Sequence, residues 1–347
     1  MLEDRQFCCD AFLMYRYIVD ENKSFRSDIK PFFFKKDHCK YHINGVDDIA
    51  DAIKSYIDEI LSLGGKIGLA LSGGIDSAIL AKYVPKDTMT YTFRCVAPGT
   101  VDETAQAKVY AQRCNLQHTV VDVTWQDYLE SSKVLMAHKG APIHSIEPQI
   151  FKAATLAREQ GVTHMLFGEN ADIIFGGMDG LLKKDWSFNE FVERYSYINP
   201  SRILKNGTQW LDPFEKYRHG DKIDFYGFIT EFFYLEANNS YENACATAGV
   251  KYASPFNRMS LDFVLDYDRI RKGDTKYLLR QLFNKLYPDL GQPVKIPMPR
   301  AVSQWLETWE GPTRQEFIPN CISGLNADQK WMVFILERFL NQIDVNE

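Results

Sequence analysis

The chain has 347 residues, which is enough for two domains or for one large domain with an appendage. Hydrophobic residues make up 45% and charged residues 25%, so the apolar side chains can offset the entropy of ordering the backbone, which excludes global disorder. The 40 lysines and arginines against 46 aspartates and glutamates give a net charge of −6, without a run of five or more like charges. We therefore expect no nucleic-acid partner.

The seven cysteines are scattered, and none belongs to a Cys-x-x-Cys pair that would suit zinc or redox chemistry. This usage is typical of a reducing compartment. The N-terminus has no apolar stretch behind a positive start, and no apolar run approaches the ~18 residues that span a bilayer. The sequence therefore predicts a cytoplasmic protein without a membrane partner.

The first 45 residues are rich in aromatic side chains and irregular in pattern. Residues 12–19 fit either a helix or a strand, and residues 31–34 fit a short extended piece. Their role does not follow from the pattern alone.

Residues 46–180 alternate helices with short strands. Apolar residues recur at helical spacing from 46 to 63, and the apolar run 66–71 predicts a buried parallel strand. Further strands are predicted at residues 90–93, 119–123 and 165–167, and further helices at residues 78–83, 102–114 and 148–160. This alternation predicts an α/β fold with a parallel sheet flanked by helices.

Beyond residue 180 the pattern changes to longer helical segments with many aromatic side chains, as in residues 227–243, 276–286 and 328–341. No repeat period stands out, so a solenoid is not supported. We therefore expect three parts: an N-terminal segment (1–45), an α/β core (46–180) and a mainly helical part (181–347).

The segment most informative about function is Ser72-Gly73-Gly74-Ile75-Asp76-Ser77, between a predicted strand and a helix. In that order, backbone N–H groups converge on an anion, and glycines let the chain approach a phosphate closely. The lysine of the motif Gly-x-x-x-x-Gly-Lys-Ser/Thr is missing, so cleavage at the γ-phosphate is not indicated. The alternative is a glycine turn without a ligand.

A strand followed by Ser-Gly-Gly-x-Asp-Ser resembles the signature of the ATP pyrophosphatases, or PP-loop enzymes, which split ATP between its α and β phosphates. The resemblance implies a Rossmann-like sheet of the adenine nucleotide α-hydrolase type. It also implies that the loop holds pyrophosphate as the leaving group while a substrate oxygen attacks the α-phosphorus. The nucleotide-binding residues that it implies at this loop are Leu71, Ser72, Gly73, Gly74, Asp76 and Ser77.

A second motif narrows the resemblance. Residues 167–177, Phe-Gly-Glu-Asn-Ala-Asp-Ile-Ile-Phe-Gly-Gly, are similar to the Gly-Glu-Gly-Ala-Asp-Glu-x-x-Gly-Gly segment of asparagine synthetases. The resemblance implies that Asp76 and Asp172 hold Mg²⁺, that Glu169 lies near the nucleophile, and that Gly168 contacts the nucleotide. In the alternative interpretation, Asp172 caps a helix and Glu169 is a solvated loop acid.

Later segments extend the resemblance to about residue 310. They are Pro255-Phe256-Asn257 with Asp262, Lys276-Tyr277-Leu278-Leu279-Arg280, and Lys295-Ile296-Pro297-Met298-Pro299 with Trp305-Leu306. The family's lysine in the last segment stabilises the adenylate, which implies that Lys295 is catalytic, with Lys251 and Lys276 as competitors. Lys276 is also an expected nucleotide-binding residue. The alternative for Lys295 is an ordinary surface lysine.

The resemblance breaks at two places. Glutamine-dependent asparagine synthetases begin with a catalytic cysteine of a glutaminase domain, whereas this chain begins Met1-Leu2 and its residues 1–45 resemble the segment that joins the two domains. We therefore expect no glutaminase domain, and nitrogen from free ammonia, an amine or a separate glutaminase subunit. The family often dimerises, so a homodimer stays open.

The second difference is Ile173, where asparagine synthetases carry Glu; the string ending in Gly176-Gly177-Met178 is closer to the β-lactam and carbapenam synthetases. Those enzymes place Tyr where Glu169 stands, so their mechanism is not implied either. The acid substrate therefore stays open among aspartate, sugar acids and peptidic acids. The polar candidates for its pocket are Tyr234, Glu236, Tyr241 and Glu242.

Together these features predict an ATP-dependent, AMP-forming amide ligase that adenylates a carboxylate and transfers the acyl group to ammonia or an amine. Glu169 would assist the nitrogen nucleophile, and the adenine ring should lie near Leu71 and Thr92-Phe93-Arg94. Two rivals remain. One is a PP-loop sulfurtransferase, which usually carries a cysteine pair and a basic tRNA surface; the other is a non-catalytic nucleotide-binding subunit, against which retention of both Asp76 and Asp172 speaks.

Overall fold

A computed structural model describes residues 2–36, 38–294 and 298–344. Its centre is a sheet of five parallel strands in the order β10-β7-β4-β5-β6. These strands are β4 (Ile67–Ala70), β5 (Met89–Cys95), β6 (Gln117–Val123), β7 (His164–Leu166) and β10 (Lys251–Ala253). The predicted α/β fold with a flanked parallel sheet is therefore confirmed.

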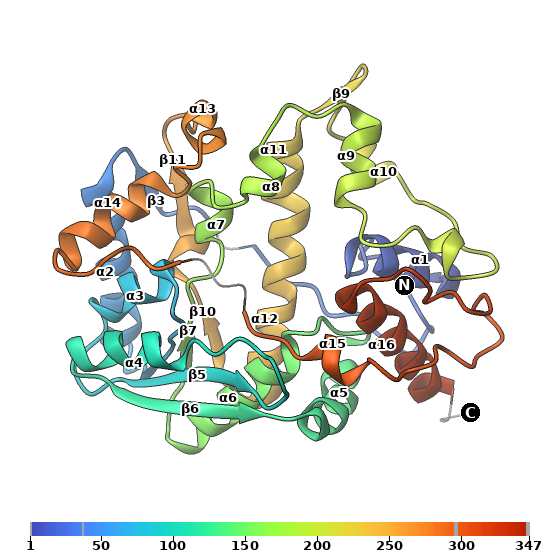
Figure 1. Cartoon of the computed structure of the whole chain (residues 1–347), viewed down its shortest axis with the longest axis horizontal. Coiled ribbons are helices and arrows are strands. Elements are labelled where there is room, and N and C mark those ends of the chain that lie inside the picture. The colour runs from blue at the N-terminus through green and yellow to red at the C-terminus, as the bar shows by residue number, and fades with distance from the viewer. Residues whose placement is uncertain (1, 37, 295–297, 345–347) are drawn as a thin grey trace.

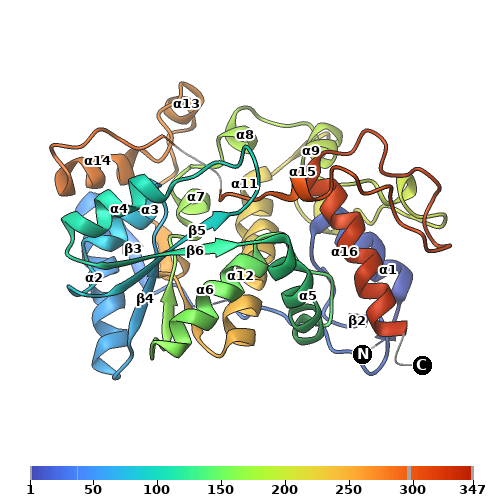
Figure 2. The same cartoon turned by 60° about the horizontal axis from the view of Figure 1, so that its bottom comes forward.

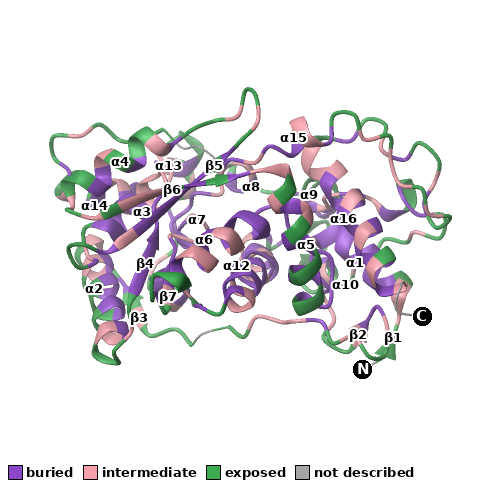
Figure 3. Cartoon of the chain, turned by 90° about the horizontal axis from the view of Figure 1, so that it is seen from below, coloured by how far each residue is buried: buried purple, intermediate pink, exposed green. Residues whose placement is uncertain are grey.

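Helices cover both faces of the sheet (Figures 1 and 3). On one face lie α2 (Val46–Ser62), α3 (Ile75–Ala81), α4 (Thr104–Arg113) and α14 (Tyr277–Leu286); on the other lie α6 (Glu147–Glu159) and α12 (Tyr234–Ala248), with α5 (Trp125–Lys139) packed beside α6. Each face of the sheet forms its own hydrophobic core with the helices that cover it. Because side chains alternate along a strand, Leu69 of β4 packs into the core on the α2 side and Ala70 packs into the core on the α12 side. The sheet is thus buried on both sides, as its nearly continuous apolar strands require.

The helix α2 illustrates how the sequence sets an element's ends. The Asp48 carboxylate accepts the N–H groups of Asn44 and Gly45 at 2.8 and 3.0 Å, which caps the helix start. Ile49, Ile53 and other residues at helical spacing are buried against the sheet. The predicted helix at 46–63 is confirmed, and it ends before Gly64, whose φ of 75° suits glycine.

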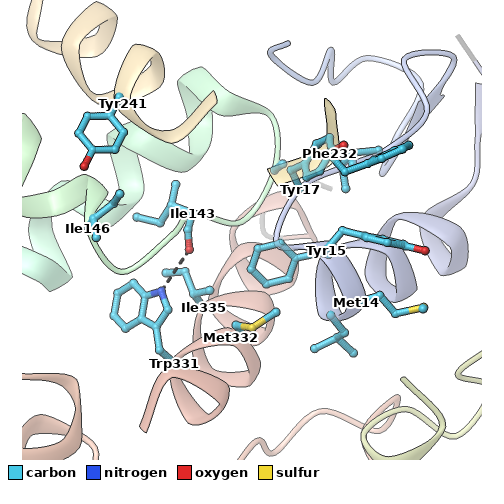
Figure 4. Packing of buried hydrophobic residues seen from close by; sticks show 14 of the residues in the cluster. Met14, Tyr15, Tyr17, Ile143, Ile146, Phe232, Tyr241, Trp331, Met332 and Ile335 are labelled. Carbon is cyan, nitrogen blue, oxygen red and sulfur yellow. Dashed lines mark hydrogen bonds between the residues drawn. The ribbon is translucent and has the colours of Figure 1, made fainter. Parts of the chain in front are cut away.

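The remaining chain forms a mainly helical body beside this layer. Its α1 (Arg5–Tyr15) and α16 (Ala327–Asp344) pack side by side, far apart as they are in sequence (Figure 2). In the core between them, Met14 and Tyr15 lie near Met332, and the Trp331 indole donates to the Ile143 carbonyl at 3.1 Å (Figure 4).

The other helices are short: α7 (Ala171–Ile174), α8 (Asp179–Leu182), α9 (Phe188–Tyr195), α10 (Asp212–Glu215), α11 (Phe225–Phe228), α13 (Tyr267–Arg271), α15 (Val302–Trp305), a π-helical turn at Ile229–Phe233, and 3-10 turns at Pro200–Arg202 and Pro255–Arg258. Small two-stranded sheets pair β1 (Leu2–Glu3) with β2 (Lys23–Ser24), β3 (Tyr41–Ile43) with β11 (Met259–Leu261), and β8 (Arg218–His219) with β9 (Lys222–Ile223). Within the described ranges, no helix is both long and apolar enough to cross a bilayer.

Three features go beyond the sequence prediction. The segment 12–19 fits a helix or a strand from its sequence; in the structure residues 12–15 form the end of α1, which stops where Arg16 adopts the left-handed conformation at φ 62°, and residues 16–19 are neither helix nor strand. The 15-residue helix α5 was not predicted, since its apolar residues do not form one stripe. The fifth strand, β10, comes from residues 251–253 in the mainly helical half and pairs with β7.

Candidate functional site

The candidate site lies where β4 and β7 end. These strands are neighbours, with Leu69 opposite Leu166, and the carboxyl edge of a parallel sheet is where such folds bind ligands. A cavity of about 210 Å³ opens there, called here the sheet-edge cavity. Its walls are Ala70, Leu71, Ser72, Asp76, Ser77, Tyr91, Phe93, Glu103, Phe167, Gly168, Glu169, Asp172, Tyr241 and Met298.

Two serines fix the shape of the Ser72–Ser77 loop. Their hydroxyl oxygens lie 2.8 Å apart, and the Ser77 hydroxyl accepts the Ser72 N–H at 3.0 Å. The Ser72 hydroxyl in turn accepts the Gly74 N–H at 3.1 Å. The hydroxyl groups that the sequence indicated as phosphate donors therefore also hold the glycine turn in front of α3.

Glu103, just before α4, is a site residue that sequence reasoning missed. Its side chain is 3% exposed, and its carboxylate accepts the Gly73 N–H at 3.0 Å. Burial raises the pKa of Glu103 to about 6, and the hydrogen bond from the Gly73 N–H partly offsets this rise. Glu103 thus lies against the loop and orients the Gly73 amide. In the sequence, Glu103 is marked only as an acidic residue at the start of a predicted helix.

Asp76, Asp172 and Lys276 meet beside the loop. Asp76 comes from the first turn of α3, Asp172 from α7, and Lys276 from the residue before α14. The Lys276 Nζ lies 2.5 Å from Asp76 Oδ2 and 3.0 Å from Asp172 Oδ1. Burial by itself would lower the pKa of Lys276, but the two carboxylates outweigh it and raise that pKa, so the ammonium stays charged.

Two glycines make this approach of segments feasible. A β-carbon on Gly168 would lie 2.7 Å from the Asp76 β-carbon, and one on Gly177 would lie 1.9 Å from Asp172 Oδ1 and 2.3 Å from Lys276 Cε. Real β-carbons do not come this close to other atoms, so the two positions require glycine for lack of space. The motif Gly168 to Gly177 is therefore wrapped tightly around the charged group.

The two carboxylates also suit a magnesium ion. They approach one cation already, and Mg²⁺ prefers carboxylate and phosphate oxygens. These two carboxylates and the Lys276 ammonium together carry one net negative charge. No group of three or more His, Cys, Asp or Glu side chains arranged for a metal occurs in the described part of the chain, and Mg²⁺ sites commonly combine one or two carboxylates with substrate phosphates and water.

Glu169 occupies the opposite wall, on a turn set by Asn170 in the left-handed conformation at φ 69°. The Glu169 carbonyl accepts the Ser254 hydroxyl at 2.8 Å, and its carboxyl group is hydrogen bonded by the Tyr241 hydroxyl. Burial raises the pKa of Glu169 to about 7; Asp172 adds to this shift and Tyr241 opposes it. An acid with this pKa can exchange protons near neutral pH.

The rest of the sheet-edge cavity is apolar and aromatic, with Leu71, Tyr91, Phe93 and Phe167 contributing. Of the expected adenine neighbours, Leu71 and Phe93 line the cavity. Thr92 and Arg94 do not: the Thr92 hydroxyl bonds to the Leu71 carbonyl at 2.5 Å, and Arg94 pairs with Asp122 at 2.6 Å. This follows from the alternation of side chains along β5.

The structure brings most sequence-predicted site residues together. Those lining the sheet-edge cavity are Leu71, Ser72, Asp76, Ser77, Phe93, Gly168, Glu169 and Asp172; Lys276 touches two of them, and Gly73 and Gly74 form the loop. Lys295 lies outside the described residues. Among the substrate-pocket candidates Tyr241 lines this cavity, whereas Glu236 pairs with Arg16, Tyr234 packs on Phe34, and Glu242 faces a different cavity.

The parallel sheet with its ligand edge and glycine loop defines an α/β protein of the PP-loop type. The family model described as asparagine synthase matches residues 48–316, which is more than half of the chain. The chain therefore belongs to the asparagine synthase family, whose members are ATP-dependent amide ligases. A search of the curated proteins finds no match.

Proposed function

We propose that this protein is an AMP-forming amide ligase, which adenylates a carboxylate substrate and passes the acyl group to ammonia or an amine. One observation carries the proposal: the convergence of Asp76, Asp172 and Lys276 beside the Ser72–Ser77 loop, in a chain of the asparagine synthase family. This arrangement offers hydroxyl and amide donors together with one cation to the phosphates of ATP.

The nucleotide would lie across the sheet-edge cavity. The aromatic wall around Phe93 suits the adenine ring, and the loop suits the β and γ phosphates. Asp76 and Asp172 would hold Mg²⁺, which, when bound, supplies positive charge against the phosphate oxygens. Lys276 would turn its ammonium toward the same oxygens.

In the first step, a carboxylate oxygen of the substrate attacks the α-phosphorus, and the bond from that phosphorus to the bridging oxygen breaks. Pyrophosphate leaves with the electron pair. The loop and Lys276 stabilise this negative charge, and we assign the stabilisation of the acyl adenylate to Lys295.

In the second step, the nitrogen nucleophile attacks the acyl carbon and AMP leaves. The nitrogen must lose a proton, and we assign its acceptance to Glu169, whose pKa of about 7 and hydrogen bond from Tyr241 suit that role. Transfer of sulfur is less well supported, because all seven cysteines lie within the described ranges and none lines the sheet-edge cavity.

The test is ATP–pyrophosphate exchange with Mg²⁺ across a panel of acids that includes aspartate, sugar acids and peptidic acids, followed by detection of AMP and amide after ammonia is added. Exchange that depends on one acid and disappears in Asp76→Asn would support the proposal. Formation of ADP would overturn it. Binding of ATP without consumption under any condition would favour a nucleotide-binding subunit.

A further inference from the structure

A second and larger cavity adjoins the candidate site. It measures about 850 Å³ and is called here the lateral cavity. Residues of α8, α9 and the start of α16 line it. Gly177 belongs to its wall and packs directly against Asp172 and Lys276, so the charged group lies directly behind this part of the wall.

The size of the lateral cavity decides between substrate classes. Cavities of ~300–1,000 Å³ hold ligands of drug size. At about 850 Å³ this cavity is near the upper end, far larger than a single amino acid such as aspartate needs. A substrate that reaches the charged group and fills the lateral cavity must be elongated.

The deep wall of the lateral cavity is aromatic and apolar, with Trp186, Tyr195 and Met332 all at most 5% exposed, and Tyr197 beside them. Arg16 is the charged side chain in this wall, with 13% of the side chain exposed. A ligand body here would meet apolar rings and one guanidinium group.

The position of Arg16 is strongly constrained. Its backbone adopts the left-handed conformation, which costs free energy for a residue with a β-carbon. Its guanidinium carbon lies 3.8 Å from the centre of the Tyr197 ring, and its Nη2 lies 3.1 Å from Glu236 Oε2 and also bonds to the Tyr197 hydroxyl. The side chain is therefore held in one direction before any ligand binds.

Arg16 keeps donors for a ligand. A guanidinium has five N–H donors. The described residues use donors on Nη2 only; Nε has no partner among them but is itself buried, so the donors left for a ligand are those of Nη1. Planar donors of this kind match a carboxylate.

The charges around Arg16 are otherwise paired. Behind it lie Glu236, the Lys139–Glu147 pair at 2.5 Å and the Arg300–Asp328 pair at 3.2 Å. Burial together with Arg16, Arg300 and Lys139 lowers the pKa of the neighbouring His144, so this imidazole is neutral and adds no charge. Glu190, Glu193 and Arg194 are exposed and belong to the rim, where solvent screens them.

We propose that the lateral cavity binds the body of an elongated diacid: one carboxylate is activated next to Gly177, the apolar or aromatic body lies against Trp186, and the second carboxylate pairs with Arg16. This inference rests on the proposed function for the activated carboxylate. The recognition of the second carboxylate by Arg16 is independent of any turnover.

The test uses fragments of such a substrate. Binding of 3-phenylpropionate, its amide and 2-phenylethylamine to the full chain is measured by saturation-transfer NMR, with α,β-methylene-ATP present to occupy the nucleotide cavity. The probes share a phenylethyl body and present an anionic, a neutral and a cationic terminal group to Arg16. We expect the carboxylate to bind at least tenfold more tightly than the other two.

The variant Arg16→Gln/Glu236→Gln removes both charges of the pair at once, so that no buried carboxylate is left alone. It should abolish the tenfold preference. The matched control Arg5→Gln/Asp344→Asn removes another ion pair, at 2.6 Å between α1 and α16, and should keep the preference. Arg16→Lys, which retains the charge but not the planar donors, should reduce it without abolishing it.

Equal binding of the three fragments by the unaltered protein, tighter binding of the amine, or a preference that survives in Arg16→Gln/Glu236→Gln would overturn the proposal. Failure of the proposed function is distinguishable. An Arg16-dependent preference without AMP from any acid would leave the lateral cavity as assigned and remove the ligase reaction. AMP formation at equal rates from diacids and their monoamides would support the ligase reaction and overturn the pairing of a second carboxylate with Arg16.

Discussion

The Nζ of Lys276 lies 2.5 Å from Oδ2 of Asp76, although 200 residues separate them in the chain. The lysine also reaches Asp172, so one ammonium joins the glycine loop after β4 to the motif after β7. Burying either carboxylate alone would cost desolvation free energy, and the attraction of both to the Lys276 ammonium offsets this cost. This contact is the structural centre of the candidate site.

The first prediction concerns that lysine. Lys276→Met should lower the rate of ATP–pyrophosphate exchange at least 100-fold and destabilise the fold by about 3 kcal/mol, because it removes the ammonium that contacts both partly buried carboxylates. Added Mg²⁺ should raise the melting temperature of the variant more than that of the unaltered protein, since the ammonium no longer competes with the metal for these carboxylates. The control is Lys285→Met in α14, the helix that follows Lys276, because the exposed pair of Lys285 with Asp47 contributes little. A variant insensitive to Mg²⁺ would contradict the assignment of both carboxylates as metal ligands.

The second prediction concerns pH. The pKa of Glu169 is about 7, above its ordinary value, so below pH 7 the group is protonated and cannot accept a proton. The rate of amide formation should rise through about pH 7 and level off above it, whereas in Glu169→Gln this limb should vanish and the rate fall by ~100-fold. Single-turnover amide formation from a preformed adenylate measures this directly.

The same shift has a consequence for stability. Because the folded protein binds this proton more tightly than the unfolded chain, the stabilisation is fully present at low pH and is lost as pH rises through about 7. Glu169→Gln should therefore gain stability relative to the unaltered protein between pH 6 and pH 8. An unchanged difference between the two across this range would exclude the raised pKa.

The third prediction uses the lack of space at Gly177. Gly177→Ala introduces a β-carbon 1.9 Å from Asp172 Oδ1, so the carboxylate and Lys276 must move. Exchange activity should fall at least 100-fold while the circular dichroism spectrum is retained. Gly291→Ala is the control, since its β-carbon meets no atom within 4 Å. Full activity of Gly177→Ala would show that the observed spacing of the charged group is not required.

The fourth prediction separates two roles of Glu103. Glu103→Ala leaves the Gly73 N–H without its acceptor, at a cost of about 1–3 kcal/mol, and should raise the KM for ATP roughly tenfold through a loosened loop. Glu103→Gln keeps a carbonyl acceptor and should stay close to the original KM. If the two variants are equally impaired, the charge of Glu103 matters rather than its hydrogen bond.

The sheet and the loop could be predicted because their signals are local. Apolar runs such as 66–71 lie between glycines, and the order of strand, glycine turn and helix is contained in ten consecutive residues. The strand β10 could not be predicted in the same way, because three residues after a long helix become a strand only by pairing with β7. Glu103 was missed for a similar reason: its contact with Gly73 depends on how α4 packs beside the loop.

The role of Arg16 is the clearest example of a signal absent from the sequence. The residue follows α1, and nothing nearby marks it as different from other arginines. Only the tertiary fold, in which α1 packs against α16, brings it next to Tyr197 and Glu236. In the helical half, the sequence therefore predicts pocket residues only from their polar side chains. Of the four candidates chosen in this way, only Tyr241 lines the sheet-edge cavity.

The most direct test of the proposed reaction follows oxygen. The protein is incubated with ATP, Mg²⁺, ammonia and an acid whose carboxylate is labelled with ¹⁸O, and the nucleotide products are analysed by mass spectrometry. Attack of the carboxylate on the α-phosphorus predicts AMP that carries one ¹⁸O atom, with unlabelled pyrophosphate. Label in inorganic phosphate together with ADP, or unlabelled AMP alongside the amide, would contradict the account.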